Sequence, residues 1–351
     1  MPGQLPMPDV ACPTIKNVSC AKMMNRTLPE ISVCTTTFNS SAYIREAIEG
    51  VLAQDVGVEI EYVISDDCSS DETPEILDEY AGKYPDIIRI LHQPGNIGLN
   101  SNFMTAVRAC RGKYIALLDG DDYWIDPHKL QLQYDFLENH PDIVLCSTAS
   151  LKLYQQSGVY ERSHCYLPAN TGEVKVFDTA EMYKLEPFWL PTHSLLIRAK
   201  SVVFPDWFKD VVYVDRALRL ILSLDGGLAF INRITCVYRL HDSNTSSDRH
   251  TSPEVCRGYM HTYRNFYHYS GGRFQSDASK AINHSLCEER RRILASCSGT
   301  DRVKHLAGNF LSALRHFQIL KPRDFAEFVY HFLFIKSLLL YSRSEGHPDA
   351  G

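Results

Sequence analysis

The sequence lacks the cysteine pattern of a disulfide scaffold or of a zinc site. Its eleven cysteines are an odd number, lie far apart and include no CxxC pair. Several stand in apolar runs such as DIVLCST, where cysteine acts as a small hydrophobic residue. These features exclude a small disulfide-rich secreted protein and favour a reducing, cytoplasmic setting.

The chain also lacks a net positive charge, an apolar run near its N-terminus and any internal repeat. With 36 Lys and Arg against 42 Asp and Glu, the net charge of −6 gives no reason to expect nucleic acid as a partner. Because its first residues have no continuous apolar core, a signal peptide is not expected, and residues 1–28 are predicted to form a loose leader.

Charge is distributed unevenly along the chain. Residues 249–343 hold 15 Lys and Arg against 7 Asp and Glu, an excess of 8, so the rest sums to −14 within the total of −6. The region 248–343 has a helical pattern and includes an apolar run at 325–341 that is too short and too charged for a confident membrane span. We expect these helices to contact a membrane peripherally, or to pack on their own domain or in a homodimer, with 344–351 as a tail.

Between residues 30 and 148, β-rich runs alternate with amphipathic helical patterns. The predicted strands are ISVCTT (31–36), EIEYVIS (59–65), IIRIL (87–91), YIALL (114–118) and DIVLCST (142–148). Strands separated by helices in this way indicate an α/β fold, Rossmann-like, with a mostly parallel sheet and flanking helices. After residue 150, shorter strand-like pieces such as LAFI and ITCVYRL mix with short helices.

Three carboxylates crowd around Gly120 directly after the fourth predicted strand, at Asp119, Asp121 and Asp122. Like charges this close repel one another unless water or a cation screens them. Mg²⁺ and Mn²⁺ prefer oxygen ligands, typically one or two carboxylates plus substrate phosphates. The motif therefore indicates a divalent cation site, although a structural Asx turn is the alternative for the motif taken alone.

Other polar segments follow the first two predicted strands, at residues 35–39 and 65–72. Ligands of open α/β sheets bind beyond the carboxyl ends of the strands, so these segments and the acidic turn are expected to meet at one rim. Residues 93–102 are expected beside the same rim. Asp215 begins an otherwise apolar helix, where the alternative to a functional role is a charge favoured by the helix dipole.

Taken in order, these motifs resemble those of glycosyltransferase family 2, whose members have the GT-A fold. The resemblance covers roughly residues 30–247 and is carried by ISVCTTTFN, YVISDDCSSDET, NIGLNSN, LLDGDDYWIDPHKLQ, PTHSLLIR, VDRALRL and CVYRLHDSNTS. It implies a nucleotide-sugar-binding half at 29–125 and an acceptor-binding half at 126–247. The chain departs from the family at Phe38, where Tyr is commoner, and at Val214, where Gly or Glu often precedes the catalytic Asp.

The resemblance also implies roles for single residues. Nucleotide-sugar binding would fall to Thr36, Phe38, Asn39, Asp67, Asn96, Gly98, Asp119 and Gly120. Mn²⁺ or Mg²⁺ would be held by Asp119, Asp121 and His241, and Asp215 would be the general base. The implied reaction moves a sugar, with inversion, from a nucleoside-diphosphate sugar (a UDP-sugar first) to a hydroxyl of a glycan or lipid-linked acceptor, such as a growing cell-surface polysaccharide. It would take place in the cytoplasm or at the inner face of the plasma membrane.

Two other functions could use similar parts. A sugar-phosphate nucleotidyltransferase usually carries a glycine-rich loop with Arg or Lys after its first strand, and TTTFNSSAYIRE has no glycine there. A non-catalytic nucleotide-sugar-binding protein is the other alternative. The complete set of aspartates argues against a decayed site.

Overall fold

The structure, a computed structural model, describes residues 28–163, 173–183, 190–242, 244, 253–296, 299–326 and 328–329. The chain divides into two compact units. The first contains the residues up to 182 together with 186–210 and 214–244, and the second contains 183–185, 211–213 and the chain from 245 onward. The predicted division of 29–247 into donor and acceptor halves stays a prediction.

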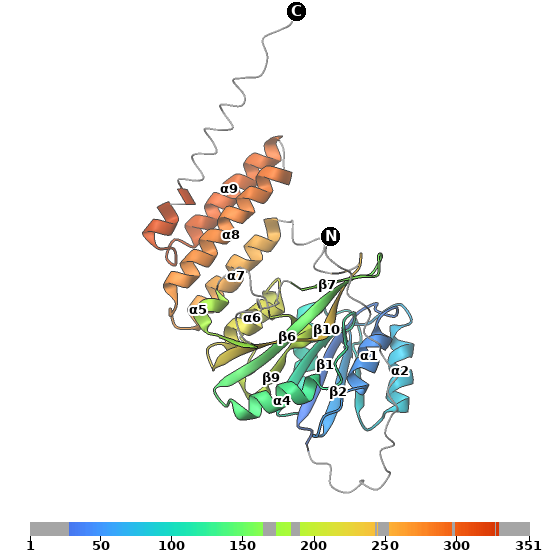
Figure 1. Cartoon of the computed structure of the whole chain (residues 1–351). Helices are drawn as coiled ribbons and strands as arrows, with labels where there is room; N and C mark the ends of the chain where they lie inside the picture. Colours follow the sequence, from blue (N-terminus) through green and yellow to red (C-terminus); the bar gives the residue numbers. More distant parts are fainter. Residues whose placement is uncertain are drawn as a thin grey trace, which may run out of the picture. The chain divides into compact units, whose positions relative to one another are not determined.

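A single mixed sheet forms the centre of the first unit (Figure 1). Its described strands are β1 (Ile31–Thr37), β2 (Ile60–Asp66), β3 (Ile88–His92), β4 (Tyr114–Asp119), β5 (Tyr123–Trp124), β6 (Ile143–Tyr154), β7 (Val159–Arg162), β8 (Val174–Phe177), β9 (Leu196–Arg198) and β10 (Gly227–Leu240). The order is β3-β2-β1-β4-β9-β6-β10-β5, with β7 beside β6 and β8 beside β10. Strands β3, β2, β1 and β4 pair in parallel, while β9 runs antiparallel between β4 and β6. The predicted α/β fold with a mostly parallel sheet is confirmed.

The helices of this unit cover both faces of the sheet. They are α1 (Ile44–Leu52), α2 (Thr73–Lys83), α3 (Leu99–Ala109), α4 (Lys129–Asn139), α5 (Thr179–Met182) and α6 (Val214–Leu222), with short 3-10 turns at Thr192–Ser194, Ala199–Ser201 and Asp206–Asp210. Apolar residues of α1, α2 and α4 share one core with alternate residues of β1, β2 and β4. Helix α3 lies on the other face, because its Asn102 bonds to Ser65, which points away from that core.

One strand takes the place of the two pieces expected near residues 228 and 234. LAFI and ITCVYRL are both part of β10, which pairs in parallel with β6 along its length. The register shifts between Ile231 and Ile234, and there the backbone N–H of Asn232 bonds instead to the carbonyl of Glu173. The polar pair Asn232 and Arg233 thus marks a bulge inside a continuous strand rather than a loop between two strands.

The second unit is helical, as its sequence pattern predicts. Helices α7 (Pro253–Tyr269), α8 (Gln275–Ser296) and α9 (Gly299–Arg315) pack in succession, with α8 touching both of the others (Figure 1). Most of the apolar run at 325–341 lies outside the described residues. Among the described residues, no helix has the length and apolarity that crossing a bilayer requires.

Candidate active site

The carboxyl ends of three parallel strands form the rim where the predicted site residues meet. In the register of the sheet, Thr36 of β1 pairs with Asp119 of β4, and Thr37 pairs with Asp66 of β2. The Gly120 N–H donates to the Thr36 carbonyl over 3.1 Å, so the acidic turn is fixed to the end of β1. Polar segments distant in sequence therefore begin from one edge, as parallel pairing predicts.

Glycine at position 120 follows from crowding at this edge. A Cβ added there would lie 2.7 Å from Thr37 Oγ1 and 2.8 Å from Thr37 Cβ, too close for any side chain. Because the backbone must pass this close to β1, the two aspartates that flank Gly120 are held against the rim rather than on a free loop.

Asp67 organises the loop that contains Asn96 and Gly98. The buried Asp67 carboxylate accepts the N–H of Ile97 over 2.7 Å and that of Gly98 over 3.0 Å. Gly98 has φ +83°, a conformation that favours glycine, and its N–H also reaches Asn96 Oδ1 at 3.1 Å. The structure thus brings these three predicted nucleotide-binding residues together, and their roles stay predictions.

Phe38 and Asn39 follow the end of β1. The Phe38 residue is 47% exposed, so one large ring at the rim is left accessible to a flat ligand. Asn39 has φ +50°, and its Oδ1 accepts the N–H of Ser70 over 2.8 Å. Asn39 therefore ties the turn after β1 to the loop after β2.

The structure also brings together Asp121 and His241, two of the predicted metal ligands. Asp121 Oδ2 lies 3.1 Å from His241 Nε2 and 3.2 Å from Asn244 Nδ2. The Asp121 side chain is 26% exposed, and the His241 ring packs against Tyr43 with ring centroids 4.6 Å apart. Asn244 was missed, although it lies in the quoted motif CVYRLHDSNTS, because an Asn in a polar loop has no distinguishing pattern.

A second, deeper group consists of Asp119, Asp122 and His193, whose ligand atoms lie within 4.8 Å of one another. His193 Nδ1 is 2.8 Å from Asp122 Oδ2, and these side chains are 4% and 0% exposed. Within the described residues, the buried His193 Nε2 has no hydrogen-bond partner. His193 was also missed: PTHSLLIR was quoted for the family, but a single histidine in it carries no spacing signal.

Arg239 holds the acidic turn from the β10 side. Its backbone N–H donates to Asp122 Oδ1 and its Nε donates to the Asp121 carbonyl, both over 2.8 Å. Its guanidinium also bonds to Gln155 and, over 3.0 Å, to Glu46. The buried arginine thus brings one positive charge to the carboxylates, a role that YRLH alone did not indicate.

Burial and crowding set the electrostatics of the turn. Burial first, and then the charges of Asp122, Asp121 and Asp215, raise the pKa of Asp119 to about 8, while His193 acts in the opposite direction. Burial and the Asp121 charge likewise raise the pKa of Asp122. The carboxylates therefore favour a proton or a cation among them.

Asp215 lies in the first turn of α6, near enough to the acidic turn for its charge to act on Asp119. Arg219 Nη2 bonds to Asp215 Oδ2 over 2.7 Å, and its Nη1 bonds to the Leu190 carbonyl. The predicted general base is thus held in one orientation by an arginine one helical turn away.

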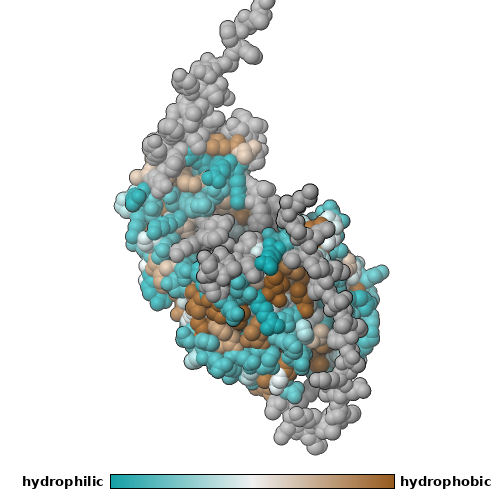
Figure 2. All heavy atoms as spheres, viewed as in Figure 1, coloured by the Kyte–Doolittle hydropathy of each residue, from teal (hydrophilic) through white to brown (hydrophobic). Residues whose placement is uncertain are grey.

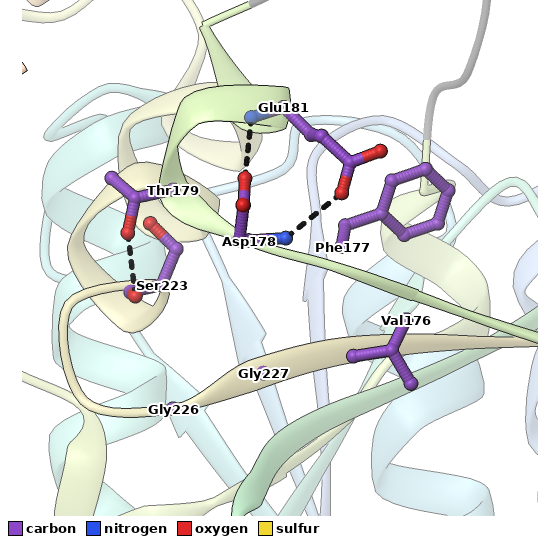
Figure 3. Close-up of a pocket in the computed structure, with 8 residues that line it drawn as sticks. All are labelled: Val176, Phe177, Asp178, Thr179, Glu181, Ser223, Gly226 and Gly227. Carbon is purple, nitrogen blue, oxygen red and sulfur yellow. Dashed lines mark hydrogen bonds between the residues drawn. The ribbon is translucent and has the colours of Figure 1, made fainter.

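A separate surface pocket of about 300 Å³ lies between β8, α5 and the turn from α6 to β10 (Figure 3). Its two carboxylates cap α5: Asp178 accepts the N–H of Glu181 over 2.8 Å, and Glu181 accepts that of Asp178 over 3.2 Å. This reciprocal arrangement is a capping box, so these acids have a structural role.

Comparison with known proteins identifies a family for part of the chain. The family described as Glycosyl transferase family 2 matches residues 32–177. Residues 32–177 belong to that family. This family 2 domain contains β1 to β8, and with them the acidic turn and the Asp67 loop.

The chain is also similar to other proteins and to solved structures. An uncharacterised protein of Mycobacterium tuberculosis is 32% identical over 211 residues, 60% of this chain and 59% of its own length. The chondroitin synthase of Escherichia coli is 28% identical over 221 residues, 62% of this chain and 30% of the synthase. The crystal structure of S. aureus TarS 1–349 with UDP-GlcNAc has a TM-score of 0.62 at 16% identity, over 84% of this chain and 82% of the TarS 1–349 chain. The chain thus spans less than two thirds of the mycobacterial relative, and the family 2 domain has the predicted GT-A fold.

The raised pKa of Asp119 predicts a pH-dependent gain from Asp119→Asn in protein freed of metal with EDTA. Between pH 4 and 8 the folded chain keeps a proton that the unfolded chain loses, so this group lowers stability as the pH rises. Asparagine has no carboxyl proton to lose, so its contribution to stability does not change with pH in this range. We expect Asp119→Asn to raise the Tm more at pH 8 than at pH 5. The exposed control Asp206→Asn should leave the Tm unchanged at both pH values. An equal change of the Tm at both pH values in Asp119→Asn would refute the raised pKa of Asp119.

Proposed function

We propose that the chain transfers a sugar, with inversion, from a nucleoside-diphosphate sugar to a hydroxyl of a glycan or lipid-linked acceptor. The observation that carries the proposal is the meeting, at one sheet edge, of an exposed ring, a buried aspartate loop and a crowded acidic turn with Asp215 nearby. A UDP-sugar is our first candidate, because TarS, which shares the fold, is seen with UDP-GlcNAc. The family 2 domain supports the same class of donor.

The donor would lie along the rim. Phe38, which is about half exposed, would stack on the base, while Asp67 and the Asn96–Gly98 loop would line the base pocket. Thr36 and Asn39 would border this pocket from the turn after β1. Stacking on one face and polar contacts at the edge is the usual way a flat base is held.

We assign the divalent cation, Mn²⁺ or Mg²⁺, to Asp119, Asp121 and His241. Carboxylate oxygens suit these ions, and the raised pKa of Asp119 reflects a need for positive charge. We prefer Asp121 and His241 to Asp122 and His193 as ligands. The Asp121 side chain is 26% exposed and can be reached by a diphosphate, whereas that of Asp122 is 0% exposed. When bound, the cation would stabilise negative charge on the leaving diphosphate. Asp122 and His193 would then fix the turn.

Asp215 would take the proton of the acceptor hydroxyl as that oxygen attacks the anomeric carbon. Its ion pair with Arg219 supports this role by fixing the direction of the carboxylate. Asp215 belongs to a different element from the acidic turn, so it can stay free of the cation and face the acceptor. The acceptor itself would be bound by residues 126–247.

Asp121→Ala tests the cation assignment. We expect Mn²⁺-dependent cleavage of the donor to fall by roughly 10²-fold or more, because a ligand that positions charge stabilisation is lost. Release of nucleoside diphosphate measures this cleavage, and calorimetric titration of Mn²⁺ into the purified variant measures its Mn²⁺ affinity, with Asp206→Ala as an exposed control for both. Unchanged Mn²⁺ affinity and Mn²⁺-dependent donor binding in Asp121→Ala would remove this residue from the site.

Asp215→Asn separates binding from transfer. The amide keeps the size of the carboxylate but cannot take a proton, so we expect donor affinity to persist while transfer falls by about 10²–10⁴-fold. Donor affinity by thermal shift and transfer by release of nucleoside diphosphate are measured on the same preparations, with Asp206→Asn as the control. Near-normal turnover would place the base elsewhere, with Asp66, Asp122 and Asp242 tested next.

A further inference from the structure

Helix α9 and the turn after it leave large apolar side chains in water. Leu311, Leu314 and Phe317 are 54%, 47% and 56% exposed, whereas Ala313 and His316 between them are buried. Spacing of three residues places the exposed side chains along one side of the helix and its continuation. On the visible face of the helical unit, Figure 2 shows apolar residues among the polar surface. Three large exposed apolar residues in succession are unusual for a surface that meets only water.

Exposed basic residues lie near this apolar row in the sequence. Lys304, Arg315, Lys321 and Arg323 are all exposed. Arg315, Lys321 and Arg323 make no ion pair with any residue that the structure describes. The described part of 304–326 has one acid, Asp324, which accepts a hydrogen bond from Ser279 Oγ. The surface therefore combines apolar side chains with an excess of positive charge.

Acidic residues of the same unit are engaged by other arginines. Glu254 and Glu289 both pair with Arg257, and Glu288 pairs with Arg291. These pairs lie on α7 and α8 and do not include Arg315, Lys321 or Arg323. Part of the positive excess in the sequence of 249–343 therefore lies near the exposed apolar residues. We call this surface the α9 face and define it as Leu311, Leu314, Phe317, Arg315, Lys321 and Arg323.

We propose that the α9 face docks on an anionic phospholipid surface. Apolar side chains insert at the boundary between head groups and acyl chains, and each nearby Lys or Arg adds attraction to an anionic surface. Charge decides against a second copy of this chain as the occupant, because two such faces would bring their arginines and lysines together. Three side chains and a few charges give reversible binding.

The benefit of docking rests on the proposed function, because docking would hold the enzyme where a lipid-linked acceptor lies. The binding itself needs neither donor nor cation. A failure of docking is therefore distinguishable from a failure of the proposed transfer reaction.

Co-sedimentation of the full-length chain with vesicles tests the proposal. We expect binding to phosphatidylglycerol–phosphatidylcholine vesicles at low salt, weakening as salt rises, and at least about tenfold weaker binding to pure phosphatidylcholine. The triple variant Leu311→Glu, Leu314→Glu, Phe317→Glu should lose at least about tenfold in vesicle affinity. The matched control Val174→Glu, Val176→Glu, Val203→Glu makes the same charge change at three exposed apolar residues of the first unit and adds the same like-charge repulsion. The loss on the α9 face should exceed the loss in this control.

A second variant guards against misfolding of the first. Arg315→Gln, Lys321→Gln, Arg323→Gln keeps the apolar row and should lose the preference for anionic vesicles while donor cleavage stays normal. The proposal is overturned if the folded wild-type chain ignores anionic vesicles at low salt. It is equally overturned if both α9 variants bind them as the wild type does, or if sedimentation equilibrium shows a dimer that only the α9 variants dissolve.

Discussion

Burial and crowding of the carboxylates at the end of β4 are the constraint on which the rest of the site depends. Burial first, and then the nearby charges of Asp122 and Asp121, raise the pKa of Asp119 to about 8. Groups from distant parts of the chain contact the acidic turn. Arg239 donates hydrogen bonds to the Asp121 carbonyl and to the Asp122 carboxylate, and His193 lies against Asp122. These contacts hold the turn in one shape, so the proposed cation site would be formed before any ligand arrives, which is the condition for effective electrostatic catalysis.

The topology of the sheet brings these distant residues to the acidic turn. Parallel pairing of β1, β2 and β4 brings the ends of three strands to one edge, and the hydrogen bond from the Gly120 N–H to the Thr36 carbonyl fixes the acidic turn there. Strand β10 pairs with β5 at residues 236–237, and this pairing brings Arg239 and His241 back to a turn more than a hundred residues earlier. The short antiparallel β9 follows the turn that carries His193.

Much of this could be predicted from the sequence, and the exceptions have physical causes. Alternating strand and helix patterns predicted the parallel sheet, and the acidic turn could be located because carboxylates beside a buried strand are unusual. His193, Arg239 and Asn244 could not be assigned, because their importance comes from long-range contacts and not from local spacing. The continuity of β10 across LAFI and ITCVYRL could not be predicted, because the hydrogen bonds of the two polar residues between these pieces are long-range.

The measurement that tests the central claim most directly is a screen of UDP-, GDP- and dTDP-sugars, each with and without Mn²⁺, that follows the Tm and the release of nucleoside diphosphate. Our account predicts that at least one nucleotide sugar, a UDP-sugar first, raises the Tm only when Mn²⁺ is present and is cleaved under the same conditions. If no nucleotide sugar stabilises the chain, or if cleavage proceeds equally well in EDTA, the rim is not the cation-assisted donor site described above.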